Sequence, residues 1–279
     1  MIIDSHVHIW TQQPERYPWA PIGDYVPDSE ASAEQLLEVM DTNRVDGTVL
    51  VQPTPYGWDN RYLLDALQSH PDRFRAVCLV DPFSAGNAQE MTHLVKQYDV
   101  SGFRLNWNLH TPEVWETSPE HAAFWDAAGK LDCPLCIQCT PEHFDLLGST
   151  CRKYPNVMVV IDHLGRVSAE NGLEAPEFQK LLALAGLPNV HVKISGWYYC
   201  SQQVPPFENL YPLAAGIIQT FGARRCMWGS DFPFIQERWN YAGMLETIKT
   251  WDFLSTDDLN WLQGKSAHNL WWKGSTTEG

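Results

Sequence analysis

The sequence repeats one pair of segments along its whole length: an apolar, β-branched run typical of a strand, then a stretch with the apolar spacing of a helix. The strand-like runs span residues 1–10, 46–54, 74–82, 101–108, 133–139, 157–165, 189–196 and 225–233. The helix-like segments span residues 29–45, 61–71, 88–100, 121–132, 144–155, 176–188 and 210–222. Ser29 is the expected N-cap of the first helix, and the chain after residue 233 is expected to be helical and rich in tryptophan.

Eight such repeats predict a parallel sheet that is covered by helices on both sides. This number closes into a barrel more naturally than it forms an open doubly wound sheet. The glycine-rich G-x-G-x-x-G signature of a dinucleotide-binding fold does not follow the first strand. We therefore predict an α/β fold, a (β/α)8 TIM barrel, with one domain over residues 1–279 and a frayed tail over residues 274–279.

Composition narrows the classes of partner. The chain has 279 residues, of which 44% are hydrophobic, and a formal net charge of −15. This charge argues against nucleic acid and anionic membranes as partners, since both require clustered Lys and Arg. No apolar run approaches the roughly 18 residues of a membrane span, and the first residues lack the features of a signal peptide. We therefore expect a cytoplasmic protein. The negative net charge does not exclude a small anionic substrate, which would need only two or three local arginines.

Seven cysteines, an odd number, favour free thiols over a disulfide framework. Cys133, Cys136 and Cys139 form a C-x-x-C-x-x-C pattern that could suggest a metal cluster. However, they lie in a short apolar run that is typical of a buried strand, and residues three apart on a strand face opposite sides. We interpret them as core residues.

Two histidines, His6 and His8, interrupt the first strand-like run near its carboxyl end. Side chains two apart on a strand point to the same face. Such a pair can hold a metal ion or polarise one substrate atom, and the alternative is a half-buried pair with polar partners.

Polar groups also stand at the other strand ends, where the active sites of barrels lie. They are Arg104, Asn106 and Trp107 on the fourth strand, Gln138 on the fifth, Asp162, His163 and Arg166 on the sixth, Ser195, Trp197 and Tyr198 on the seventh, and Ser230 and Asp231 on the eighth.

The HxH pair, the DHLGR of residues 162–166 and the GSDFP of residues 229–233 resemble the amidohydrolase superfamily, and the resemblance covers essentially the whole chain. The segments YPW at 17–19, GFRLN at 102–106 and KISG at 193–196 are similar to one branch of it. That branch holds lactone hydrolases, including 2-pyrone-4,6-dicarboxylate lactonase, 4-sulfomuconolactonase and the L-fucono- and L-rhamnonolactonases.

Two positions depart from the superfamily pattern. Members with two metals carry a carboxylated lysine on the fourth strand, where this chain has Arg104, and many have a histidine on the fifth, where it has Gln138. His143 is expected to begin a helix instead. The resemblance therefore implies one divalent ion, with Zn²⁺ favoured over Mn²⁺, or none, and argues against a binuclear centre.

The resemblance also implies the roles of the site residues. Asp231 is the expected base that takes a proton from water and returns it to the leaving oxygen. His6, His8 and His163 would polarise the lactone carbonyl, either directly or through a Zn²⁺ ion held with Asp231.

Further residues would bind the substrate. Arg104 and Arg166 would bind a carboxylate or sulfonate, although Arg104 could instead form a buried structural ion pair. The other candidates are Asn106, Gln138 and Tyr198 as polar contacts, and Trp10, Trp19, Trp107 and Trp197 as flat faces for a ring. The roles of Gln138 and Tyr198 stay open, His110 could reach the site, and the remaining histidines, including His121, are expected on helices, loops or the surface.

The leading hypothesis is thus a hydrolase that opens a small lactone of the sugar or muconolactone type. Because only two arginines can be placed at the site, a singly anionic or neutral substrate is favoured over a dicarboxylate. One alternative is a decarboxylase of the same superfamily that acts on an aromatic or muconate acid, and another is a non-catalytic barrel. Tryptophans near the C-terminus leave a homo-oligomer open.

Overall fold

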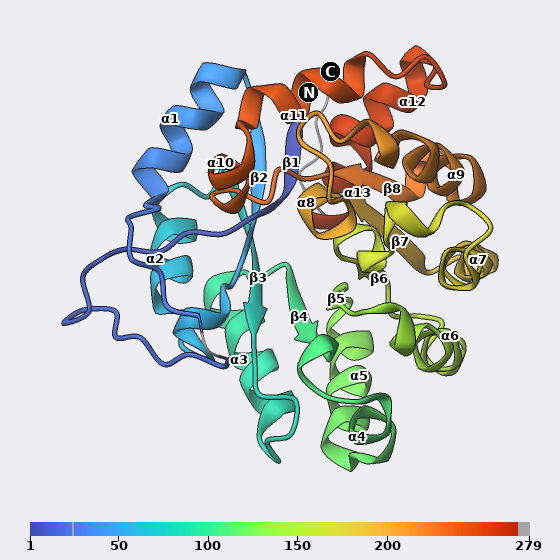
Figure 1. Ribbon diagram of the computed structural model, residues 1–279. Helices are drawn as coiled ribbons and strands as arrows, with labels where there is room; N and C mark the ends of the chain where they lie inside the picture. Colours follow the sequence, from blue (N-terminus) through green and yellow to red (C-terminus); the bar gives the residue numbers. More distant parts are fainter. Residues whose placement is uncertain (24, 273–279) are drawn as a thin grey trace.

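The strand-like runs pair in the order in which they occur in the sequence. The computed structural model describes residues 1–23 and 25–272, and within them eight strands form one parallel sheet in the order β1 to β8 (Figure 1). The strands are β1 (Ile3–Val7), β2 (Gly47–Val51), β3 (Phe74–Leu79), β4 (Gly102–Asn106), β5 (Leu135–Gln138), β6 (Val159–Ile161), β7 (Val190–Ile194) and β8 (Cys226–Trp228). The sheet curves into a nearly closed barrel with helices around it, which confirms the predicted (β/α)8 TIM barrel.

Helices connect successive strands and pack their apolar faces against the outside of the barrel (Figure 1). Those between the strands are α1 (Ala33–Asn43), α2 (Arg61–Ser69), α3 (Asn87–Tyr98), α4 (Pro112–Thr117), α5 (Pro119–Leu131), α6 (Phe144–Lys153), α7 (Pro176–Ala183), α8 (Trp197–Cys200) and α9 (Tyr211–Phe221). After β8 follow α10 (Phe234–Arg238), α11 (Tyr241–Lys249), α12 (Thr256–Asn260) and α13 (Ser266–Trp271), so the end of the chain is helical as predicted. The predicted frayed tail lies outside the described residues.

The inside of the barrel is apolar at its amino-terminal end. Side chains such as Val49, Val77 and Val160 point inward and pack against Leu270 and Trp271 of α13. This helix covers the end of the barrel opposite the carboxyl ends of the strands. This apolar end of the barrel leaves the opposite end, at the carboxyl ends of the strands, as the place for polar groups.

Asp4 joins the first strand to the last. Its Oδ1 atom accepts hydrogen bonds from the backbone N–H groups of His6, at 3.1 Å, and Ser230, at 2.9 Å. Its Oδ2 atom accepts a hydrogen bond from the Tyr241 hydroxyl at 2.8 Å. One buried carboxylate thus fixes the loop after β8 against β1.

The first helix begins later than the sequence indicated. Ser32, not Ser29, is its N-cap, because Ser32 and Gln35 form a capping box in which each side chain accepts a backbone hydrogen bond from the other residue. Ser29 instead accepts a hydrogen bond from the Trp10 indole through its carbonyl oxygen. The Ser29 prediction was wrong because Ala31 forms an antiparallel bridge with Trp10, so the helix can begin only after it.

Several strands also end earlier than their apolar runs indicated. β6 stops at Ile161 and β8 at Trp228; residues His163–Arg166 form a short 3-10 helix, and residues 229–233 lie outside the strand, with Phe232 bridged to Val7. Residues 197–200, which follow β7, form the short helix α8. Two of these segments are joined by the hydrogen bond that the Tyr198 hydroxyl donates to Asp231.

The cysteines are core residues, as predicted. All seven are free and buried. Cys136 points into the barrel interior, whereas Cys133 and Cys139 pack in the outer layer, which confirms the alternation expected of a strand. In the described part of the chain, no helix combines the length and the apolar character needed to cross a bilayer.

His121 on α5 is a buried residue of the outer layer. Its Nδ1 atom lies 2.8 Å from the Trp115 carbonyl oxygen, and its Nε2 atom accepts a hydrogen bond from the Trp125 indole at 2.9 Å. Both ring nitrogens thus have the partners that a neutral imidazole requires. Burial lowers the pKa of His121 to about 4.

This environment predicts a pH-dependent stability. Because the folded pKa lies below the unfolded value of about 6.5, the unfolded chain binds more protons between pH 4 and 6.5, and stability falls as the pH falls. His121→Gln can keep both hydrogen bonds without titrating. In urea unfolding, this variant should lose less stability than the wild type between pH 6 and 4.5, by about 1 kcal/mol per pH unit. Equal losses in the two proteins would contradict a neutral His121.

Candidate active site

The site lies at the seam where β8 meets β1. The Nε2 atoms of His6 and His8 are 3.2 Å apart. Asp231 follows β8, and its Oδ1 atom lies 3.6 Å from His6 Nε2 and 3.5 Å from His8 Nε2. All three side chains are buried. Two imidazoles therefore face one carboxylate oxygen, and the histidines emerge on the same face, as their spacing predicted.

His163 joins this group from the end of β6. Its ring centroid lies 4.5 Å from that of His6, and its Nδ1 atom lies 3.0 Å from the Ser195 hydroxyl. Burial lowers the pKa of His163 to about 4, so the ring is neutral near pH 7. A neutral, held imidazole can donate or accept one hydrogen bond at the nitrogen that faces the site.

The backbone is left-handed at both His163, with φ 54°, and Asp231, with φ 60°. Residues 164–166 share this conformation, which costs non-glycine residues roughly 1–2 kcal/mol each. Gly196 packs against this turn with φ 59°, and a Cβ atom there would lie 2.4 Å from His163 Nδ1. The glycine of the KISG segment thus makes room for the His163 ring.

The Asp231 carboxylate has one constrained oxygen and one available oxygen. Oδ2 accepts a hydrogen bond from the Tyr198 hydroxyl, while Oδ1 makes no hydrogen bond and faces the histidines. Burial opposes ionisation of Asp231, but His163, His8 and His6 outweigh it and hold the carboxyl pKa below its usual range. The group is therefore an ionised acceptor aimed at the site.

A second charged layer lies beneath these residues. Asp162 forms ion pairs with Lys193, at 3.0 Å, and with Arg104, at 2.9 Å. Burial works against ionisation of Asp162, yet Lys193, His6 and Arg104 hold its pKa well below its usual value. Burial and the Lys193 charge lower the pKa of His6, so this ring is neutral. Sequence reasoning gave Lys193 no role, although a lysine within the apolar run VHVKIS was a signal for one.

The residues present fit a single metal ion. In the described part of the chain, one group of His, Cys, Asp and Glu side chains is arranged to hold a cation, namely His6, His163 and Asp231. Each offers one ligand atom, and these atoms lie within 4.8 Å of one another. Two imidazole nitrogens and one carboxylate oxygen suit Zn²⁺. His8, which was also predicted as a ligand, is not part of this group.

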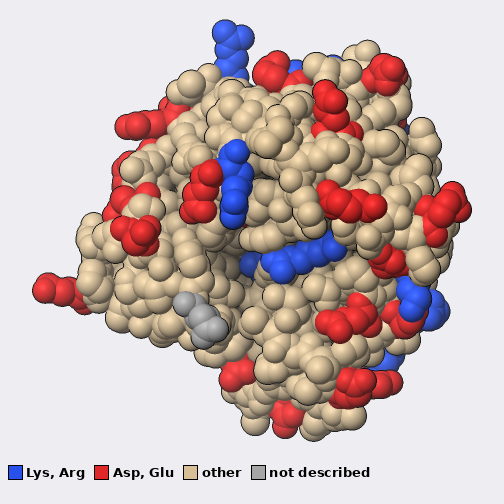
Figure 2. All heavy atoms as spheres, in the orientation of Figure 1, with Lys and Arg blue, Asp and Glu red and all other residues tan. Residues whose placement is uncertain are grey.

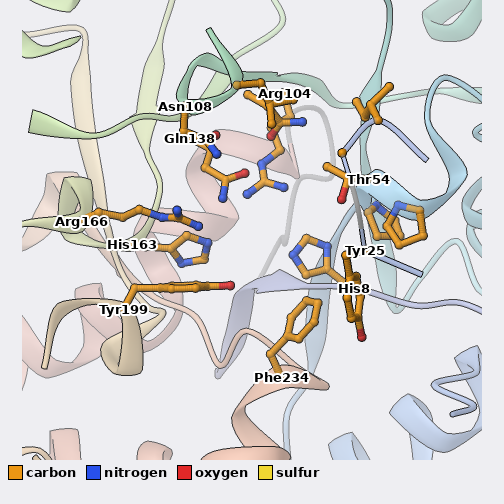
Figure 3. Close-up of a pocket in the computed structure, with 16 residues that line it drawn as sticks. His8, Tyr25, Thr54, Arg104, Asn108, Gln138, His163, Arg166, Tyr199 and Phe234 are labelled. Atoms are coloured by element: carbon orange, nitrogen blue, oxygen red, sulfur yellow. The ribbon is translucent and has the colours of Figure 1, made fainter. Parts of the chain in front are cut away.

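A cavity of about 310 Å³ opens above the group. Its lining comes from the carboxyl ends of strands and from the segments that follow them. Figure 3 shows His8, Arg104, Gln138, His163 and Arg166 converging around it. Figure 2 shows Lys and Arg atoms inside the hollow of this face and Asp and Glu side chains mostly around it. Basic side chains thus gather in this hollow, although the chain as a whole has a formal net charge of −15.

Four predicted binding residues line the cavity: Arg104, Asn106, Gln138 and Arg166. Both amide atoms of Asn106 are buried without a hydrogen-bond partner, and so is Nε of Arg166. The Arg166 guanidinium lies 4.2 Å from the Tyr199 ring. Two roles were considered for Arg104, a buried ion pair and a contact with substrate. The structure shows the ion pair with Asp162 and also places Arg104 in the lining of the cavity.

The structure does not bring the predicted tryptophans to the cavity. Trp107 is fully buried and stacks on Trp115, Trp197 stacks on Trp251, and Trp19 stacks on Tyr56. Trp10 is buried beside Phe234. These indoles lie in packed layers and not among the residues that line the cavity, so their role as ring-binding faces stays a prediction. Tyr198 also does not line the cavity, and its contact is with Asp231.

The aromatic lining comes from three residues that sequence reasoning missed: Tyr25, Tyr199 and Phe234. Tyr199 directly follows a predicted site residue, and Phe234 lies three residues after Asp231. His110 and His143 do not line this cavity. His143 Nε2 lies 2.9 Å from the His110 carbonyl oxygen and fixes the loop after β4.

Comparison with known proteins agrees with this geometry. The sequence model of the Amidohydrolase family matches residues 3–271. The chain is 28% identical over 231 residues to the L-fucono-1,5-lactonase of Burkholderia ambifaria, with 83% of this chain and 80% of the relative covered. It is also 28% identical over 245 residues to the 4-sulfomuconolactone hydrolase of Hydrogenophaga intermedia, with 82% and 74% covered.

A solved structure from Pseudomonas putida, described as a candidate 2-pyrone-4,6-dicarboxylic acid hydrolase, superposes with a TM-score of 0.84 at 28% identity. The superposition covers 97% of each chain. Since the family match spans nearly the whole described chain, the protein belongs to the amidohydrolase family and is an enzyme of that superfamily.

Proposed function

We propose that this enzyme hydrolyses a small lactone of the sugar or muconolactone type that carries at most one anionic group. The observation that carries the proposal is the Asp231 carboxylate, whose available oxygen faces His6 and His8 beneath a cavity lined by Arg104 and Arg166. The lactone hydrolases among the relatives support the same reaction class.

In the proposed reaction, Asp231 takes a proton from a water molecule while the water oxygen attacks the ring carbonyl carbon. The ester C–O bond then breaks, and Asp231 returns the proton to the ring oxygen that leaves. The product is an open-chain hydroxy acid. The Tyr198 hydroxyl occupies the other carboxylate oxygen and so directs Oδ1 toward the water. General base catalysis of this kind contributes typically 10²- to 10⁴-fold.

The histidines would stabilise the charge that develops on the carbonyl oxygen. His6 and His163 are neutral rings that can each present an N–H group to it. A divalent ion held by His6, His163 and Asp231 would add Lewis-acid polarisation of the same oxygen.

The limit on substrate charge follows from the two arginines. Arg104 is already paired with Asp162, whereas Nε of Arg166 has no protein acceptor. The described lining therefore offers about one uncompensated positive charge. One carboxylate or sulfonate would be bound in a bidentate manner, with the uncharged polar groups held by Asn106 and Gln138.

The proposal is tested by a pH-indicator screen of aldonolactones and muconolactones, run with and without chelator. We expect opening of at least one lactone of these classes. Chelator-sensitive opening would assign His6, His163 and Asp231 as ligands, and chelator-resistant opening would make the histidines direct donors. If no lactone is opened under either condition, the proposed function is wrong and decarboxylation becomes the reaction to test.

Asp231→Asn tests the base. Asparagine tolerates the left-handed backbone and still accepts the Tyr198 hydrogen bond, but it cannot take a proton. We expect kcat for lactone opening to fall by roughly 10²- to 10⁴-fold with little change in Tm. Wild-type turnover in this variant, measured under the same conditions, would refute the assignment.

Arg166→Met tests anion binding. The lost charged hydrogen bonds should raise KM for a carboxylated lactone by roughly 10- to 100-fold and leave KM for a neutral lactone nearly unchanged. Arg152→Met, at an exposed position on α6, is the matched control and should change neither value. A similar rise in KM for both lactones would show that Arg166 acts on the shape of the cavity and not on charge.

A further inference from the structure

Lys193 is a buried charge for which the proposed reaction has no direct use. It lies on β7 and is fully buried, and no other described lysine is buried. Its Nζ atom donates to His6 Nδ1 at 3.0 Å and to Cys136 Sγ at 3.3 Å, and it lies 3.0 Å from Asp162 Oδ1. The Trp271 ring lies 5.3 Å below it. The ammonium group is thus held on all sides at a fixed point beneath His6.

The partner of His8 indicates the direction of the hydrogen bond between His6 and His8. His8 Nδ1 lies 2.7 Å from the Val51 carbonyl oxygen, which can only accept. His8 therefore carries a hydrogen on Nδ1, and Nε2 is the ring nitrogen left to accept a hydrogen bond. His6 Nε2 lies 3.2 Å from His8 Nε2, a distance at which a hydrogen on His6 Nε2 can be donated to His8.

The contact between Lys193 and His6 favours the same tautomer of His6. A lysine ammonium group has three donors and no acceptor. His6 Nδ1, at 3.0 Å from Lys193 Nζ, must therefore present a lone pair. A neutral ring with a lone pair on Nδ1 carries its hydrogen on Nε2. Two independent contacts, one on each nitrogen, thus agree on a chain of donors from Lys193 through His6 and His8 to Val51.

We propose that Lys193 is a positioning residue that holds His6 in the Nε2–H tautomer and thereby weakens metal binding at this site. In this state the hydrogen on His6 Nε2 points to His8, and only the other tautomer gives a metal a lone pair on Nε2. That tautomer would carry its hydrogen on Nδ1 and donate it to Asp162 Oδ1, which lies 3.3 Å away. The catalytic meaning of this tautomer rests on the proposed lactone hydrolysis.

Removal of Lys193 should convert the pair into a better metal site. In Lys193→Met, Asp162 becomes the partner of His6 Nδ1, which gives the carboxylate–histidine arrangement that supports zinc ligands. We expect Zn²⁺ alone, titrated calorimetrically into metal-free protein without any lactone, to bind roughly 10- to 100-fold more tightly than to the wild type. Cys136→Ala is the matched control. It removes the contact of Lys193 with Cys136 and leaves the contact of Lys193 with His6 in place. Its zinc affinity should equal that of the wild type.

The wild type provides a second readout that needs no stable Lys193 variant. Long-range ¹H–¹⁵N correlation spectra of metal-free, ¹⁵N-histidine-labelled protein report the tautomer of each ring, with the His6 signals assigned by their loss in His6→Gln. We expect hydrogen on Nε2 of His6. Hydrogen on Nδ1, or zinc affinity in Lys193→Met no higher than in the wild type and Cys136→Ala, would overturn the proposal. Neither measurement uses a lactone, so failure of the proposed function would not affect them.

Discussion

The structure of the site depends on charges that are buried together inside the barrel. Asp162 compensates both Lys193 and Arg104 at a level where water is excluded, and each charge is tolerated only because the other two are present. Loss of one partner of a buried pair leaves an uncompensated charge, which costs about 3–5 kcal/mol. The network adds little net stability but fixes positions: Arg104 is aimed at the cavity, and Lys193 is held against His6.

At the site above these buried charges, several residues have backbone conformations that their own side chains disfavour. His163 and Asp231 both have left-handed backbone, and the closure of β1 against β8 through Asp4 keeps Asp231 beside the two histidines of β1. Strained conformations persist only where the surroundings over-determine them. Here the hydrogen bonds between the β8 loop and β1, together with the packing of Gly196 on His163, provide that constraint.

Much of the fold and part of the site could be predicted from the sequence. Eight strand–helix repeats indicated the barrel, and parallel strands place their carboxyl ends on one rim, so His6, His8, His163 and Asp231 were expected to meet there. Arg104 and Arg166 follow from the same rule and reach the cavity. The tryptophans at the strand ends do not line the cavity. The position of a residue at a strand end does not determine whether its side chain points into the cavity or into the surrounding helix layer. Trp107 and Trp197 find aromatic partners outside the barrel, whereas Tyr199 and Phe234 face the cavity.

The sequence by itself determined the barrel, its apolar interior and the set of ionisable groups at its rim. These depend on periodicity and on short-range rules of strand geometry. Only the tertiary structure decided which partner each ring nitrogen of His6 and His8 faces, that Asp231 leaves one oxygen available, and that Lys193 contacts His6. These properties depend on atoms more than 30 residues apart, such as Val51 and His8 or Lys193 and His6, that meet within hydrogen-bond distance. Contacts of that kind exist only once the strands have closed around one another.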